Sequence, residues 1–234
     1  MKQIIVTFLV VLVSHIGFAQ DINQFDANGG KRHGIWKKNF EGTTQPRYEG
    51  GFNHGKEVGL FKFYKLIKKK SVLTATKQFN ANDNSAYVTF LSSRGKVISE
   101  GKMDGKKYVG TWTYYHKNSN AVMSTETYDN NGLLQGEKLV FYKDGVVAER
   151  ANYVDGKLQG ESDWYSVKGV VLKAFIYDND ELHGVAKYYD GKAQLLAEGH
   201  YKRGKKVGVW KYYEKGELTR EKDFSAVVKY SKKQ

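Results

Sequence analysis

The sequence contains no cysteine, and its 234 residues include a single proline. Without cysteine there is no disulfide scaffold, no thiolate metal site, no cysteine nucleophile and no lipid-modified N-terminal cysteine. Apolar residues make up 40% of the chain, a low value for a compact globular core. Aromatic residues nevertheless make up 14%, too much for a disordered chain. With 25 glycines and 17 tyrosines, the composition is typical of many tight turns between short aromatic strands.

The first residues have the pattern of a secretory signal peptide. Lys2 precedes an apolar run over residues 4–13, which is shorter than the roughly 18 residues that a membrane span requires. Gly17 and Ala19 supply the small residues expected before a cleavage site. We therefore predict a signal peptide over residues 1–19 and an exported product, periplasmic or extracellular, that starts at Gln20. No other segment is apolar enough to cross a membrane, so no transmembrane segment is expected in the mature chain.

Basic residues outnumber acidic residues by 38 to 25, which gives a formal charge of +13. Removal of residues 1–19 would remove one lysine and no acid, leaving +12. In an exported protein this charge favours anionic envelope polymers, lipid head groups or acidic proteins as partners, and no nucleic acid is expected.

A repeat of 24 to 26 residues runs through most of the chain. Its units begin with a small residue, called the anchor here, followed by aromatic residues at the second, fourth and fifth positions after it. In seven of eight units the fifth position is aromatic, where the overall aromatic content predicts about one. The anchors are Gly34, Gly59, Ser85, Gly110, Gly136, Gly160, Gly184 and Gly208, with Ser85 in a degenerate copy.

Each unit reads as two short strands separated by tight turns. Six-residue segments between glycine-containing turns such as Asp144-Gly145 and Asp155-Gly156 are too short for stable helices, and Asp-Gly favours hairpins. We predict an all-β fold, an elongated antiparallel β-meander of about eight hairpins in a single-layer twisted sheet. The anchor glycines are expected to leave room for rings from the neighbouring strand.

Alternation along the strands predicts two aromatic faces. Positions two and four after each anchor share one face, and position five lies on the other. The first face would carry Trp36, Phe61, Phe63, Tyr87, Trp112, Tyr114, Trp164, Tyr188, Trp210 and Tyr212, and the second the ladder from Tyr64 through Phe90 to Tyr213.

The repeat units resemble the MORN repeat. The resemblance rests on residues 30–36 (GKRHGIW) and 47–52 (RYEGGF), and later units such as 155–161 (DGKLQGE) and 204–213 (GKKVGVWKYY) resemble the bacterial variant found in YwqK-family antitoxins. It covers about residues 28–224. The resemblance implies an elongated β-meander that serves as a binding or scaffolding surface, and a toxin as one possible partner. The predicted organisation is a linker at 20–30, the repeat array at 31–224 and a basic tail at 225–234.

The sequence offers no catalytic constellation. Its six histidines are not paired at metal-ligand spacing, and no phosphate loop, dinucleotide fingerprint or nucleophile elbow occurs. We therefore predict a non-enzymatic protein with no catalytic residues, no cofactor and no metal.

Two functions remain open. The first is binding of another protein, an acidic one or a toxin, along the aromatic ribbon. The second is binding of an anionic envelope polysaccharide or lipid head groups through aromatic and Lys/Arg side chains. The candidate binding residues are the same for both: Trp36, Phe61, Trp112, Tyr114, Trp164, Tyr188, Trp210 and Tyr212.

Overall fold

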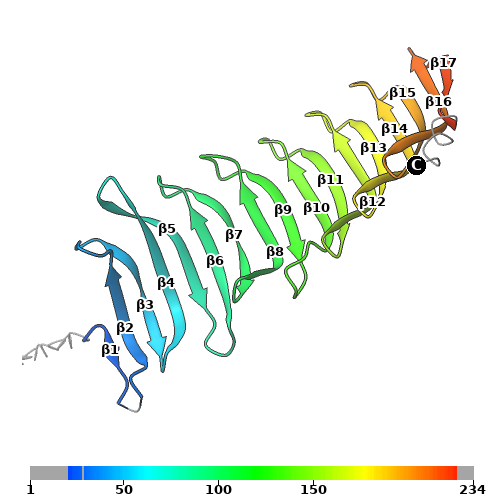
Figure 1. Ribbon diagram of the computed structural model, residues 1–234. Helices are drawn as coiled ribbons and strands as arrows, with labels where there is room; N and C mark the ends of the chain where they lie inside the picture. The colour runs from blue at the N-terminus through cyan, green and yellow to red at the C-terminus, as the bar shows by residue number, and fades with distance from the viewer. Residues whose placement is uncertain (1–20, 28, 226–234) are drawn as a thin grey trace, which may run out of the picture.

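The chain forms one open antiparallel sheet in which each strand pairs with the next one along the sequence (Figure 1). The computed structural model describes residues 21–27 and 29–225. The predicted signal peptide, and all but the first residue of the predicted tail, lie outside these described residues. All seventeen elements are strands, which confirms the all-β meander.

The strands are β1 (Gln24–Phe25), β2 (Arg32–Asn39), β3 (Pro46–Asn53), β4 (Lys56–Ile67), β5 (Lys70–Phe79), β6 (Ser85–Leu91), β7 (Val97–Asp104), β8 (Lys107–Tyr115), β9 (Val122–Tyr128), β10 (Gly136–Phe141), β11 (Val147–Val154), β12 (Lys157–Tyr165), β13 (Val171–Asp178), β14 (Glu181–Tyr189), β15 (Leu195–Lys202), β16 (Lys205–Glu214) and β17 (Glu217–Asp223).

Strands β2 to β17 form eight successive hairpins, and every anchor lies in the first strand of its hairpin. The extra strand is β1, which pairs with β2 through Gln24 and Phe25. This two-residue strand lies within residues 20–30, the interval predicted as a linker. Asn23 extends the contact, because its backbone N–H donates to the carbonyl of Ile35 and its side-chain oxygen accepts from the N–H of Lys37.

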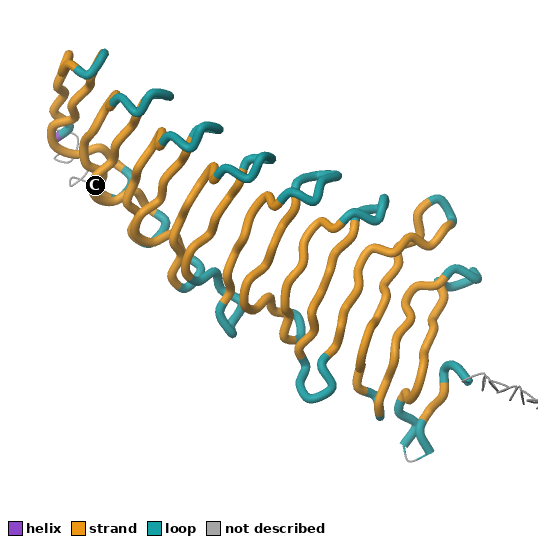
Figure 2. Tube along the Cα trace, turned by 180° about the vertical axis from the view of Figure 1, so that it is seen from behind, coloured by secondary structure: helices purple, strands orange, loops and turns teal. Residues whose placement is uncertain are grey.

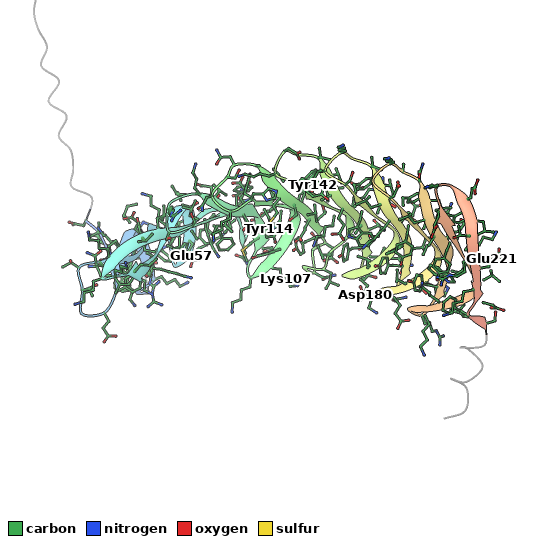
Figure 3. All side chains as sticks on the ribbon, turned by 90° about the horizontal axis from the view of Figure 1, so that it is seen from above. Glu57, Lys107, Tyr114, Tyr142, Asp180 and Glu221 are labelled. Atoms are coloured by element: carbon green, nitrogen blue, oxygen red, sulfur yellow. The ribbon has the colours of Figure 1, made fainter. Side chains whose placement is uncertain are left out.

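The ribbon is long and twisted, with turns along both of its edges (Figure 2). Seen from above it follows an arc, and side chains project from both faces (Figure 3). Strands β1 and β17 lie at opposite ends, so each hairpin contacts mainly its two neighbours (Figure 1).

The seven anchor glycines are required by backbone conformation. All have positive φ, between 63° and 102°, in the region that L-residues rarely adopt. A Cβ at six of these anchors would meet no other atom within 4 Å. The expectation that rings of the neighbouring strand lie over the anchors is therefore wrong.

A different glycine, in the second strand of the hairpin, lies beneath a ring. A Cβ at Gly101 would come within 2.6 Å of the Trp112 ring, and Gly50–Phe61 and Gly199–Trp210 repeat this arrangement at 2.4 Å. The indole N–H of Trp112 donates to the carbonyl of Lys102 at 2.8 Å. Each ring thus lies flat across the strand before it and joins consecutive hairpins.

These ring-on-glycine contacts form the core. Trp112 and Trp210 are 0% exposed and Phe61 is 2% exposed, although the sheet has a single layer. Further rings pack around them, with Tyr108 stacked on Trp112 at a centroid distance of 3.9 Å. The side chains of a single face therefore bury one another.

In units such as those of Gly59 and Gly110, the anchor strand forms a β-bulge with the strand before it. The unit at Ser85 keeps the period but lacks this bulge. Strands β5 and β6 pair without a register shift, and Ser85 lacks the positive φ of the other anchors. A one-residue difference in register reverses the face of every side chain. Tyr87 is consequently 51% exposed on the opposite face and Val88 is buried in its place, while Phe90 joins the Trp112 side. The predicted faces of Tyr87 and Phe90 are therefore wrong.

The two kinds of glycine predict two different mutational costs. Gly110→Ala should cost about 1–2 kcal/mol, the cost of a left-handed L-residue, because nothing occupies the space of its Cβ. Gly101→Ala should cost more, about 3 kcal/mol, because Trp112 has to leave its position and its hydrogen bond to Lys102. Urea denaturation followed by circular dichroism measures both. Equal costs would contradict the ring-on-glycine core.

Candidate functional site

Cross-strand pairing defines the two faces of the sheet. One, called the aromatic face, carries Trp112 and Tyr114 together with Ser99, Ser124 and Glu126, their partners in β7 and β9. The other, called the tyrosine–glutamate face, carries Glu100 and Tyr115, whose side chains hydrogen-bond to each other. This division recurs along the array and separates the side chains that build the core from those on the opposite surface.

The structure places the candidate residues on the aromatic face but does not leave all of them accessible. Phe61, Trp112 and Trp210 are buried between hairpins, so these three rings cannot present their faces to a partner. The other five candidates are half-buried and contribute ring edges to the surface: Trp36, Tyr114, Trp164, Tyr188 and Tyr212.

Cations lie over the rings of the aromatic face. The guanidinium of Arg32 is 5.0 Å from the ring centroid of Trp36, and that of Arg220 is 4.3 Å from Tyr212. The ammonium of Lys206 is 3.9 Å from the Trp210 ring. Such positions are favourable because the face of an aromatic ring is electronegative. Lys77 over Phe63 and Lys222 over Phe224 complete the set among the described residues.

Positive charge predominates on this face. Among the described residues, seven basic residues pair directly across the ladder with an aromatic residue of this face, against three acidic ones. The basic residues are Arg32, Lys38, Lys77, Lys173, Lys206, Arg220 and Lys222, and the acidic ones are Glu57, Glu126 and Glu149.

A polar pair interrupts the aromatic face at its centre. Lys138 stands two residues after its anchor, the position that Trp36, Trp112 and Trp210 occupy in their units, and its Nζ lies 2.9 Å from Oε1 of Glu126. Burial opposes ionisation of Glu126, but hydrogen bonds from Tyr128 and Lys138 outweigh it and hold the pKa of Glu126 below its usual value. The pair lies between two hydrophobic clusters, one around Trp112 and one around Trp210.

The opposite face carries a repeated tyrosine–glutamate hydrogen bond. The hydroxyls of Tyr64 and Tyr115 each donate to a glutamate, Glu49 and Glu100, at 2.6 Å. Tyr213 donates to Glu198 at 2.9 Å in the last hairpin. Burial and the hydrogen bond to Glu49 raise the pKa of Tyr64 to about 12, and the hydrogen bond to Glu100 with burial raises that of Tyr115 to about 12. Each of these hydrogen bonds therefore joins the first strand of one hairpin to the second strand of the hairpin before it.

Two histidines meet at the N-terminal end although 20 residues separate them. The rings of His33 and His54 are 4.8 Å apart, and Nδ1 of His54 lies 2.8 Å from the carboxylate of Asp26. Within the described part of the chain, no group of three or more His, Cys, Asp or Glu side chains has the geometry of a metal site. No helix in that part is long and apolar enough to span a bilayer.

Neither a protein-family model nor a curated protein matches the chain.

Sequence reasoning missed the cations of the aromatic face. Lys173, Arg220 and Lys222 stand in second strands, where their facing depends on bulges between Trp164 and Tyr165 and between Tyr212 and Tyr213. A signal was present in the sequence, since Arg220 and Lys222 alternate at strand spacing toward Phe224. It could be interpreted only once the bulge positions were known.

The tyrosine–glutamate hydrogen bonds predict a loss of stability at high pH. Because the folded pKa of Tyr64 and Tyr115 lies above the unfolded value near 10, their contribution is complete below pH 10 and falls as the pH rises toward 12. The double variant Tyr64→Phe, Tyr115→Phe should lose less unfolding free energy between pH 9 and 11.5 than the unmodified chain. Urea denaturation at both values measures this. Equal losses would show that these hydroxyls do not ionise abnormally.

Proposed function

We propose that this chain is an exported, non-enzymatic repeat protein whose aromatic face binds an acidic segment of another protein. The observation that carries the proposal is the arrangement of cations over the rings of that face. A cation held against an aromatic ring keeps its charge at a fixed position, so less side-chain entropy is lost when a carboxylate binds.

The shape of the sheet favours an extended partner. Basic side chains occur from Arg32 at one end to Lys222 at the other, so a partner that follows the ribbon meets cations in several hairpins. Repeat arrays commonly use such extended surfaces for binding. The polar pair at Lys138 and the edges of half-buried rings such as Tyr114 and Trp164 supply contacts between the charged positions.

The resemblance to the bacterial MORN-repeat variant supports a scaffolding or antitoxin-like role, and on that view the acidic partner is a toxin. The signal-peptide pattern in residues 1–19 supports an interaction in the periplasm or outside the cell. Binding of an anionic envelope polysaccharide or lipid head groups is the competing function, because the same cations would attract those polymers.

A defined acidic peptide tests the proposal. A labelled 20-residue peptide of alternating Glu and Gly should bind residues 20–234 in fluorescence anisotropy, and binding should weaken steeply as salt is added. Neutralising Lys173, Arg220 and Lys222 to Gln should weaken it roughly tenfold or more, at about 0.5–1 kcal/mol for each exposed cation.

The matched control neutralises three exposed lysines of the opposite face, Lys37, Lys102 and Lys211, to Gln. This variant has the same net charge and should keep most of the affinity. Equal losses of affinity in both variants would mean that only the net charge of the chain attracts the peptide, which would contradict a binding face. Binding of polyglucuronate or phosphatidylglycerol vesicles without binding of the peptide would favour the competing function.

A further inference from the structure

A hollow opens on the aromatic face between the hairpins of β4–β5, β6–β7 and β8–β9. It has a volume of about 590 Å³, within the range of roughly 300–1,000 Å³ typical of ligand pockets. We call it the Lys77 basin. The residues that line it include Lys77, Phe90, Met103, Lys106, Tyr108 and Tyr128.

The basin adjoins the degenerate unit at Ser85, which contributes Phe90 and Met103 to its lining. Its neighbours each place a ring, Phe61 or Trp112, two residues after the anchor, but here the absence of a register shift between β5 and β6 puts Val88 on the aromatic face. Val88 is smaller than a ring, and Lys77 is its partner across β5 and β6. Val88 is fully buried and does not line the basin, but its partner Lys77 does, so the basin lies beside the position where the row of rings is interrupted.

The charges at the basin are all positive. Lys77, Lys106 and Lys107 line it together with no acidic residue. Within residues 21–27 and 29–225, none of these three lysines is in an ion pair. A smaller adjoining hollow of about 330 Å³ also includes Lys77, but Glu57 and Asp83 line it, so an anion is favoured in the larger one.

We propose that the Lys77 basin is a specificity subsite that receives an apolar or aromatic side chain flanked by acidic residues of the partner. This inference rests on the proposed function and names the sequence feature that the partner would present. Half-buried Phe90 and Tyr108 offer apolar contact, and Met103, which is 9% exposed, lines the basin with them. Lys77 and Lys106 offer charge to the flanking carboxylates.

The lining favours a peptide side chain over a sugar ring. A sugar carries hydroxyl groups around its whole edge, and each would need a hydrogen-bond partner on entering the basin. Besides the lysines and the tyrosine hydroxyls, Asn131 is the polar side chain that lines the basin. An apolar side chain has no such requirement.

Two acidic peptides test the subsite. The first is the alternating Glu–Gly peptide, and the second has one central Gly replaced by Phe. Residues 20–234 should bind the Phe peptide about fivefold more tightly, because part of one ring leaves water. Lys106→Glu should remove most of the affinity for the Phe peptide. Lys168→Glu, at an exposed hairpin turn in β12–β13, is the matched control and should have a smaller effect.

A photoreactive peptide locates the contact directly. With benzoylphenylalanine in place of the central Phe, irradiation and peptide mapping should find the adduct on Met103 or Tyr108, near the apolar floor of the basin. Equal affinity for the two Glu peptides, or an adduct in another hairpin, would overturn the subsite while leaving acidic-segment binding intact. Failure of both peptides to bind would overturn the proposed function and the subsite together.

Discussion

The structure depends on the way a single-layer sheet buries its own rings. No second layer covers the aromatic face, so a ring becomes buried only by lying across the strand before it, and that strand must offer a small residue at the point of contact. Gly50, Gly101 and Gly199 do so for Phe61, Trp112 and Trp210. In two other hairpins the residue two positions after the anchor is small. Ala186 lies opposite Phe175, and the buried Ser162 lies opposite Ala151. Every buried ring named here thus faces glycine or alanine across the ladder, as close packing in a single layer requires.

This mode of packing explains why the cations gather on the aromatic face. A ring that lies flat over a backbone covers one of its faces and leaves part of the other beside the next strand. Lys206 occupies that position over Trp210, and Arg32 over Trp36. Their charged ends lie over the rings and thus stay at the surface of the aromatic face. The same side chains therefore complete the core and make the surface basic, so the candidate binding face is a by-product of how the hairpins are held together.

Much of the architecture could be predicted because the repeat period can be counted directly in the sequence. The regular spacing of the anchors locates all eight hairpins, including the degenerate one at Ser85. The facing of residues in the degenerate unit could not be predicted, because it depends on the bulge that accompanies the anchor glycines of other units. At Ser85 the bulge is missing, and Tyr87 and Phe90 exchange faces. Burial of Trp112 and Trp210 was also beyond the pattern, since alternation alone cannot distinguish a ring lying over a glycine from a ring pointing into solvent.

The degenerate unit shows how a repeat array acquires a distinct position. A row of identical hairpins would present the same surface at every step and could not fix the register of a partner that slides along it. Loss of one bulge substitutes Val88 for a ring beside the basin, yet Val88 is fully buried and shares a cluster with Trp112 and Met103. The substitution thus changes the surface without removing the packing between neighbouring hairpins. The Glu126–Lys138 pair provides a second such interruption, and the two together give the ribbon an asymmetry along which an extended partner can be aligned.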